Sequence, residues 1–183
     1  TIPGAVIAVP ADEVELKDMM YTAMNLEHGP FIIRYPRGYG EGLAWKEHAF
    51  SEMELGKGIR LLDGTDVAVI AAGPVAYRAV EAAKSLKEKL GWNPVVYNIR
   101  YIKPVDEELL REVAERSSVV VTVEDGTVTG GLHGAVSEYM SSLDVPLRVR
   151  AVGIPDRYIS QGTQDELRHE CGLTAGCLEE VFR

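Results

Sequence analysis

Cysteine and histidine are scarce in this sequence. Its 183 residues include two cysteines and four histidines, and the histidines show no metal-ligand spacing. Cys171 and Cys177 stand close together near the C-terminus without a second pair, so no disulfide framework is indicated. We interpret both as free thiols in a reducing cytoplasm, with a disulfide or half of a metal site as the alternatives.

Long apolar runs and excess positive charge are lacking too. No run approaches the roughly 20 apolar residues that span a bilayer, and no basic segment followed by an apolar one marks a signal peptide. The formal net charge of −9 argues against nonspecific binding to nucleic acid or anionic membranes. We therefore expect neither a nucleic-acid nor a membrane partner, although local arginines can still create an anion site in a cleft.

Catalytic signatures are also missing. The sequence contains no G-x-S-x-G, H-E-x-x-H, G-x-G-x-x-G or G-x-x-x-x-G-K-[ST] motif, and neither cysteine has the surroundings of an activated nucleophile. No catalytic, cofactor-binding or metal-binding residue is predicted on this chain. If the protein is an enzyme, much of its machinery must lie elsewhere.

What the sequence does contain is a strict alternation of strand and helix patterns, with 46% hydrophobic and 26% charged residues. Strands are expected at residues 5–9, 31–35, 58–62, 66–72, 94–99, 118–123 and 147–152. Helices are expected at 12–26, 75–90, 106–115, 131–143, 163–171 and 175–182. This order predicts an α/β fold whose mainly parallel sheet is covered by helices on both faces.

Residues 1–38 are interpreted as a βαβ remnant of a second α/β domain, because a single βαβ unit buries too little to stand alone. We expect the chain to be a fragment, or a subunit that completes its sheet with another chain. Asp12 is the predicted N-cap of the first helix, and Glu15 completes a capping box. The expected buried face of that helix consists of Leu16, Met19, Met20 and Ala23.

Residues 39–57 are rich in glycine and irregular in pattern, which is typical of a linker. The sequence thus predicts three parts: a C-terminal piece of one domain at 1–38, a linker at 39–57 and a second domain at 58–183.

The stretch R-Y-P-R-G at residues 34–38 ends an apolar strand with two arginines around a proline turn. Pro36 restricts its own backbone and that of the preceding residue, while Gly38 permits a sharp turn. Arg34 and Arg37 are therefore presented at the carboxyl end of a strand, where open α/β sheets place ligands. A guanidinium held there suits a phosphate or carboxylate. The alternative is that one or both arginines pair with a neighbouring acid.

Other residues carry weaker signals. The turn from Gly126 to Gly134 offers backbone amides and a helix N-terminus, but its glycines are interpreted as serving tight turns and close packing. His133, in that helix, has no adjacent Asp or nucleophile, so either an anion contact or a structural role is open. Glu124 and Asp125 point opposite ways in an extended segment, which disfavours a shared metal. Arg100 precedes Tyr-Ile-Lys-Pro and is a candidate for an interdomain or subunit salt bridge.

Taken together, several stretches resemble the carboxyl-terminal part of the 1-deoxy-D-xylulose-5-phosphate synthase family within the transketolase superfamily. The segments lie, in the family's order, at residues 9–13, 29–38, 56–58, 100–106, 121–124, 130–131, 153–156, 161–162 and 172–173. The R-Y-P-R-G and G-I-P-D stretches distinguish this family from transketolases in general. Around Gly130 the family often continues with a further glycine, where this chain has Leu132.

The resemblance implies a thiamine-diphosphate- and Mg²⁺-dependent transferase that condenses pyruvate with D-glyceraldehyde 3-phosphate, releasing CO2. It implies that residues 1–38 end the pyrimidine-binding domain and that 58–183 form the transketolase C-terminal domain, a scaffold for a homodimer. Arg37 would hold the acceptor phosphate, and Arg34 would be the weaker candidate.

By the same resemblance, the cofactor site and activating glutamate lie in segments ahead of residue 1 or on a partner subunit, so the chain alone would be inactive. A noncatalytic assembly module, a subunit of a split transketolase and the β-type subunit of a 2-oxoacid dehydrogenase remain alternatives.

Overall fold

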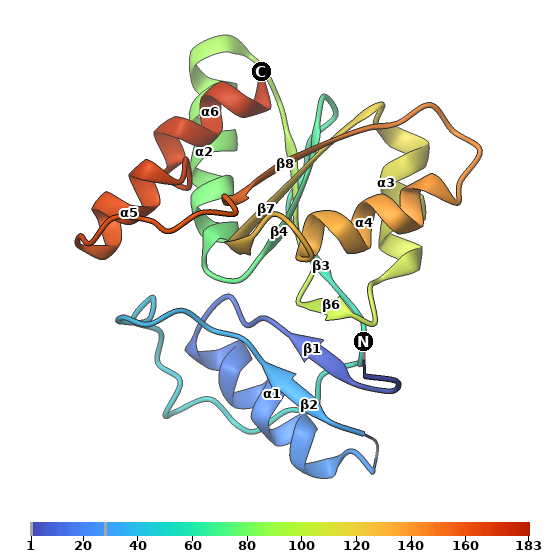
Figure 1. Cartoon of the computed structure of the whole chain (residues 1–183), viewed down its shortest axis with the longest axis vertical. Coiled ribbons are helices and arrows are strands. Elements are labelled where there is room, and N and C mark those ends of the chain that lie inside the picture. The colour runs from blue at the N-terminus through green and yellow to red at the C-terminus, as the bar shows by residue number, and fades with distance from the viewer. Residues whose placement is uncertain (1, 28) are drawn as a thin grey trace.

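A computed structural model of the protein describes residues 2–27 and 29–183. The strands are β1 (Val6–Ala8), β2 (Phe31–Ile33), β3 (Ile59–Leu62), β4 (Ala68–Ala72), β5 (Val95–Asn98), β6 (Tyr101–Lys103), β7 (Val119–Thr127) and β8 (Arg148–Ile154). The helices are α1 (Glu13–Asn25), α2 (Val75–Leu90), α3 (Glu107–Arg116), α4 (Leu132–Ser141), α5 (Gln164–Glu170) and α6 (Ala175–Phe182). Figure 1 shows β1, α1 and β2 in a small body beneath a larger one, which contains β3, β4, β5, β7 and β8 with α2 to α6.

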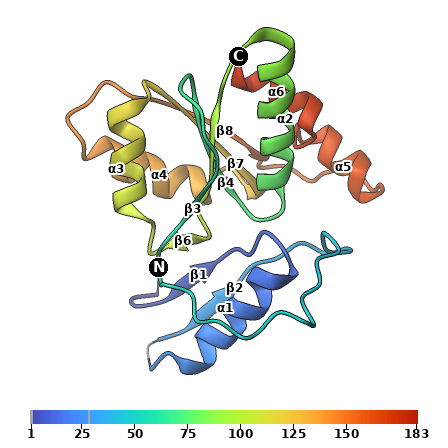
Figure 2. The same ribbon diagram turned by 180° about the vertical axis from the view of Figure 1, so that it is seen from behind.

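The larger body is built on a five-stranded sheet in the order β3-β5-β4-β7-β8. The strands β5, β4, β7 and β8 run parallel, and only the edge strand β3 is antiparallel to its neighbour. Figures 1 and 2 place α2 and α6 on one face of this sheet, with α3 and α4 on the other. The predicted α/β fold with a mainly parallel, doubly covered sheet is confirmed.

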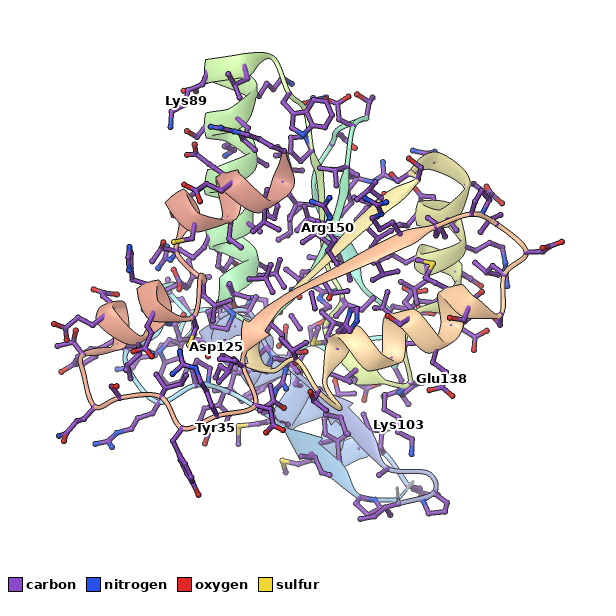
Figure 3. All side chains as sticks on the ribbon, turned by 45° about the horizontal axis from the view of Figure 1, so that its top comes forward. Tyr35, Lys89, Lys103, Asp125, Glu138 and Arg150 are labelled. Carbon is purple, nitrogen blue, oxygen red and sulfur yellow. The ribbon has the colours of Figure 1, made fainter. Side chains whose placement is uncertain are left out.

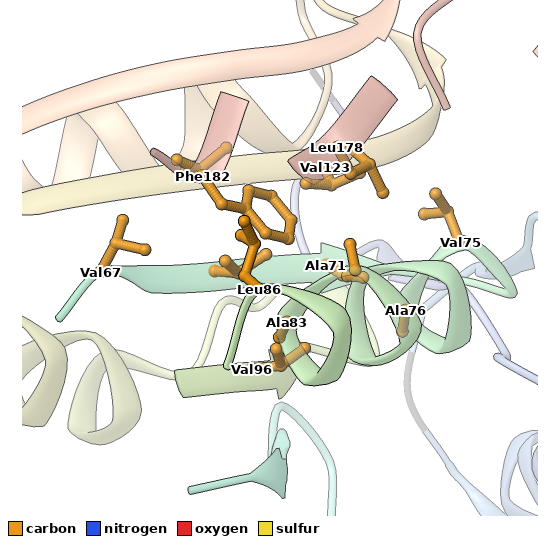
Figure 4. Close-up of a cluster of buried hydrophobic side chains, with 14 of the residues drawn as sticks. Val67, Ala71, Val75, Ala76, Ala83, Leu86, Val96, Val123, Leu178 and Phe182 are labelled. Carbon is orange, nitrogen blue, oxygen red and sulfur yellow. The ribbon is translucent and has the colours of Figure 1, made fainter. Parts of the chain in front are cut away.

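Both faces of the central strand are buried, as a continuous apolar run in a parallel strand requires. On one face Val69 and Ala71 belong to one buried cluster with Leu86 of α2 and Phe182 of α6. Figure 4 shows Ala71, Leu86 and Phe182 in this cluster. On the other face Ile70 packs with the buried residues of α3 and α4. Every residue of β4 is buried. The two apolar clusters therefore sandwich the sheet and give the larger body its core.

The smaller sheet has the order β2-β1-β6, and its third strand comes from far along the chain. β1 runs parallel to β2 but antiparallel to β6, which follows β5 directly. The Val9 amide also donates to the Arg100 carbonyl at 2.7 Å. The single strand expected at 94–99 is thus followed by a second short strand that the sequence pattern did not reveal, and this strand completes the N-terminal sheet.

The predicted face of α1 is wrong in part. Met19 is fully buried, but Met20 is 54% exposed, and Leu16 and Ala23 are only partly covered. The buried side is instead shared with the polar residues Glu15, Asp18 and Thr22. These polar groups are buried because each one has hydrogen-bond partners, which removes the penalty of leaving water.

Residues 39–57 contain neither helix nor strand, and they lie along α1. His48 Nε2 is 2.9 Å from an Asp18 carboxylate oxygen, and the Ser51 amide donates to the same carboxylate. The Met53 amide donates to Thr22 Oγ1 at 2.8 Å. The segment predicted as a linker is therefore tied to α1 by the polar side chains that were absent from the predicted face.

Other boundaries moved by a few residues. The strand expected at 31–35 ends at Ile33, although the Arg34 amide continues the ladder by donating to the Ala8 carbonyl at 2.9 Å. The strand expected to end at 123 extends to Thr127, which places Gly126 inside a strand rather than at its end. Over the described residues, no helix combines the length and apolar character needed to cross a membrane.

Candidate functional site

Arg34 and Arg37 follow β2 directly, in the short segment that leads away from the smaller sheet. The Arg34 amide still belongs to the parallel ladder, and Pro36 then turns the chain outward. Gly38 has φ of 142°, a conformation that favours glycine. The turn separates the two arginines, so they have different environments.

Arg34 points toward the larger body, where its Nη1 lies 3.0 Å from Glu124 Oε2 at the end of β7. The Glu124 side chain is only 2% exposed, whereas that of Arg34 is 33% exposed. The other Glu124 oxygen accepts the Leu132 amide at 2.6 Å. One buried carboxylate therefore joins β2 to the first turn of α4, where a negative charge also complements the helix dipole.

Two glycines make room for this ion pair. A Cβ at Gly126 would overlap the Arg34 guanidinium, and one at Gly131 would overlap both the Glu124 carboxylate and the Thr127 carbonyl. Close packing, the interpretation favoured from the sequence, is what these positions require. No anion contact is needed to explain them.

The other candidate ligands named from the sequence, among them Asp125 and His133, do not form a metal site in the described residues. His133 Nδ1 lies 3.4 Å from the Thr122 hydroxyl, so the histidine faces β7. Asp125 is partly exposed, while its neighbour Glu124 is buried, as expected for adjacent residues in a strand. Among residues 2–27 and 29–183, no group of three His, Cys, Asp or Glu side chains is placed to hold a metal ion. Cys171 and Cys177 are free thiols.

Arg100 forms the interdomain salt bridge for which it was a candidate. Its Nε lies 2.7 Å from Glu15 Oε1 in α1, and Asn98 donates to both oxygens of the same carboxylate. Arg100 has φ of 60°, unusual for a residue other than glycine. Glu15 accepts the Ala11 amide rather than the Asp12 amide, so Asp12 is the N-cap as predicted but the capping box is incomplete.

Arg37 is exposed and lies at a cavity of about 450 Å³ between the two bodies. The cavity is lined by Pro10, Ala11, Asp12, Glu13, Leu16, Tyr35, Pro36, Arg37, Gly38, Tyr39, Gly40, Glu41, Pro74 and Arg168. Tyr35, labelled in Figure 3, is 63% exposed. Within the described part of the chain, no carboxylate lies within 4.0 Å of the Arg37 guanidinium nitrogens, in contrast to Arg34.

Three carboxylates also line the cavity, and each one is engaged by another group. Asp12 accepts the Val14 and Glu15 amides and the Tyr77 hydroxyl. Glu13 accepts the Gly42 amide at 2.8 Å. Glu41 lies 3.7 Å from an Arg78 nitrogen.

These contacts affect two of the titrating groups. Hydrogen bonds from backbone amides, first its own and then those of the 41–43 loop, lower the pKa of Glu13, although burial opposes the shift. Burial, with the Asp12 carboxylate second, raises the pKa of Tyr77. Each of the three acids beside Arg37 is thus bound to partners of its own.

Sequence reasoning missed two residues of α5: Arg168, which lines the same cavity, and Gln164, which contacts the Arg37 turn. Gln164 Nε2 donates to the Arg37 carbonyl at 2.7 Å across 127 residues of sequence. Nothing in the local pattern of α5 signals this contact, because an exposed helix with an Arg and a Gln is common. The Arg37 site therefore depends on both ends of the chain.

Comparison with known proteins places this architecture in a family. The sequence model described as "Transketolase, C-terminal domain" matches residues 56–176. The chain belongs to the transketolase C-terminal domain family. The chain is also similar to the C-terminal region of 1-deoxy-D-xylulose-5-phosphate synthases.

Two such synthases illustrate the similarity. That of Bacteroides thetaiotaomicron is 42% identical over 172 residues, covering 94% of this chain and 26% of its own length. That of Dictyoglomus thermophilum is 41% identical over 179 residues, covering 98% of this chain and 28% of its own length. The transketolase-family chain thus spans little more than a quarter of the curated relatives it matches.

A solved structure described as "Split gene transketolase, inactive beta4 tetramer" superimposes with a TM-score of 0.85 and 33% identity. The superposition covers all of the present chain and 58% of the chain in that structure. A transketolase from Pichia stipitis superimposes with a TM-score of 0.67 at 19% identity, which shows the shared fold alone. The likeness to the split protein extends over both bodies of the present chain.

Proposed function

We propose that this chain is part of a 1-deoxy-D-xylulose-5-phosphate synthase and that Arg37 binds the phosphate of the acceptor, D-glyceraldehyde 3-phosphate. The complete enzyme would transfer the two-carbon unit of pyruvate to this aldehyde with release of CO2, for the synthesis of isoprenoid precursors, thiamine and pyridoxal. We place it in the cytoplasm, as a homodimer for which residues 58–183 supply a scaffold.

The observation that carries this proposal is the position of Arg37 at a cavity between the bodies, where its guanidinium has no carboxylate partner among the described residues. Arg34, three residues earlier, is bound to Glu124 at 3.0 Å and is thereby occupied. A guanidinium without a carboxylate partner offers a planar pair of donors that matches a phosphate. The identity of about 40% to named synthases over nearly the whole chain supports the same assignment.

The role of Arg37 in this proposal is electrostatic and geometric. It holds the charged end of the acceptor at a fixed distance from the aldehyde, so the aldehyde reaches the reaction centre in one orientation. The turn that carries Arg37 is held by Pro36 and by the Gln164 hydrogen bond to the Arg37 carbonyl. The backbone that carries Arg37 is therefore held in place before the phosphate binds.

We assign thiamine diphosphate and Mg²⁺ to parts of the complete enzyme outside this chain. The described residues offer no group of three metal ligands, and the cavity beside Arg37 has no such set either. Arg37 is therefore proposed to act on the acceptor alone.

The test is Arg37→Met in the complete synthase. The Michaelis constant for D-glyceraldehyde 3-phosphate should rise about 10- to 100-fold, because one or two charge-assisted hydrogen bonds are lost. The Michaelis constant for pyruvate should stay unchanged. Arg116→Met is the matched control, because Arg116 is 64% exposed on α3 and its one ion pair among the described residues is with Glu112 of its own helix. Equal effects on both substrates would refute the assignment.

A second candidate is a subunit of a split transketolase. It is favoured by the structural likeness to the split-gene protein, which extends over the whole chain. Measuring the intact mass of the protein as encoded separates the two. A gene product roughly three to four times larger indicates the single-chain synthase, whereas a product of this size requires a partner subunit that carries the thiamine diphosphate site. The substrate profile of that complex then distinguishes transketolase from 2-oxoacid dehydrogenase activity. If the complex has neither activity, the chain is a noncatalytic assembly module.

A further inference from the structure

Helix α5 lies against the turn that carries Arg37. Gln164, its first residue, donates through Nε2 to the Arg37 carbonyl at 2.7 Å. A Cβ added at Gly38 would meet the amide group of the same glutamine, so the helix and the turn are in direct contact. The start of α5 is also well defined, because Thr163 and Glu166 form a reciprocal capping box. The position of α5 relative to Arg37 is therefore set by specific hydrogen bonds.

Arg168 follows Gln164 by four residues, a spacing that places both side chains on one face of a helix. That face meets the Arg37 turn, and Arg168 lines the same cavity as Arg37. A second cavity of about 230 Å³ is also lined by both arginines, together with Asp125 and Gln164. Two guanidinium groups from opposite ends of the chain thus share one hollow.

The charge of Arg168 is poorly compensated within the described residues. Its only carboxylate neighbour there is Asp165, at 3.9 Å, and the side chain of Asp165 is 97% exposed. Such a contact contributes little, because solvent screens it. The Arg168 side chain is itself only 19% exposed. Asp12, Glu13 and Glu41 line the same cavity, but their hydrogen-bond and ion-pair partners are backbone amides, Tyr77 and Arg78. Within the described residues none of these three carboxylates lies within 4.0 Å of an Arg168 nitrogen.

We propose that Arg168 is a second binding residue for the anion that Arg37 receives, so that α5 and the β2 turn hold one phosphate between two guanidinium groups. This inference rests on the proposed function for the identity of that anion as the acceptor phosphate. Two neighbouring guanidinium groups repel one another in the absence of an anion. A dianion bound between them attracts both groups and outweighs that repulsion. A phosphate, with two negative charges and three acceptor oxygens, fits such a pair better than a carboxylate does.

The inference is tested by titrating the complete enzyme with inorganic phosphate and with D-glyceraldehyde 3-phosphate, without pyruvate, by calorimetry. Arg168→Met should weaken both dissociation constants about 10-fold, and Arg168→Lys should do so less, because it keeps the charge but loses the planar fork. In turnover, Arg168→Met should raise the Michaelis constant for the phosphorylated acceptor. The rate with unphosphorylated D-glyceraldehyde should stay the same, which a merely structural role would not predict.

Arg157→Met is the matched control, because Arg157, which precedes α5, pairs with Glu170 of that helix but lines neither cavity. Its phosphate binding should equal that of the parent enzyme. Unchanged phosphate binding in Arg168→Met would overturn the inference. If Arg37→Met loses binding while Arg168→Met does not, the proposed function stands and the inference falls. If both variants lose phosphate binding in an enzyme that makes no deoxyxylulose phosphate, the shared anion site stands and the synthase assignment falls.

Discussion

Two arginines that lie three residues apart in this chain have opposite surroundings. Arg34 leaves β2 while the ladder still continues, and its guanidinium reaches Glu124. Arg37 comes after the proline turn and faces a cavity instead. The sequence predicted that both arginines would stand at the end of a strand. It did not predict which one would be paired, because Glu124 lies 90 residues away and is brought near only by the packing of the two bodies.

Glu124→Gln should lower the free energy of unfolding by about 2–3 kcal/mol, since a buried ion pair loses one charge while its partner remains. The value lies at the low end for such pairs because the Arg34 side chain is one-third exposed. Urea unfolding of the 183-residue chain measures it. Glu138→Gln, on the exposed side of α4, should change stability by less than about 0.5 kcal/mol. A midpoint equal to that of the parent would show that the pair is not stabilising.

At the scale of elements, the sequence patterns predicted the segments with continuous or periodic apolar residues well. α2 spans the predicted residues, and β4 is buried throughout. The pattern failed where polar residues carry the packing: α1 buries Glu15, Asp18 and Thr22, and β6 has three residues. Short strands and polar interfaces leave no periodic signal, since their stability comes from partners far along the chain.

The junction of β7 and α4 offers a matched pair of glycine substitutions. Gly131→Ala should destabilise the protein by about 2–4 kcal/mol, because its Cβ would overlap the Glu124 carboxylate and the Thr127 carbonyl. Gly134→Ala, inside α4 with no atom within 4 Å of the added Cβ, should stabilise it by up to about 1 kcal/mol through helix propensity. Thermal unfolding measures both. A Gly131→Ala protein as stable as the parent would mean that the Glu124 contacts are dispensable.

At the scale of the whole molecule, the two bodies are joined by buried polar groups in addition to the chain itself. Glu15 of α1 binds Arg100 and Asn98, and the adjoining β6 completes the sheet of β1 and β2. The sequence predicted a salt bridge by Arg100, but Glu15 was assigned to the helix cap. The predicted boundary at residues 39–57 therefore divides the sequence into two parts that remain in contact in the folded structure.

Glu15→Gln should loosen the smaller body against the larger one. Hydrogen exchange at the Val9 amide, which donates to the Arg100 carbonyl, should become about 10-fold faster or more, while amides of β4 exchange as before. Native-state exchange followed by NMR measures both sites in one sample. Glu27→Gln, exposed beyond the end of α1, serves as the control. Equal acceleration in both sheets would indicate a global loss of stability, and no acceleration would show that Glu15 does not couple the bodies.

The strand β6 also has a consequence for dissection of the polypeptide. Cutting the chain within residues 39–57 would leave β6 (residues 101–103) on one piece and its partner β1 on the other. Each piece would then expose an unpaired edge strand, and unpaired edge strands favour aggregation. Coexpressed, the same two pieces carry complementary edges and a shared salt bridge. They are thus a natural pair for reassembly in a split-protein assay, in which recovery of the pair reports on the Glu15–Arg100 contact.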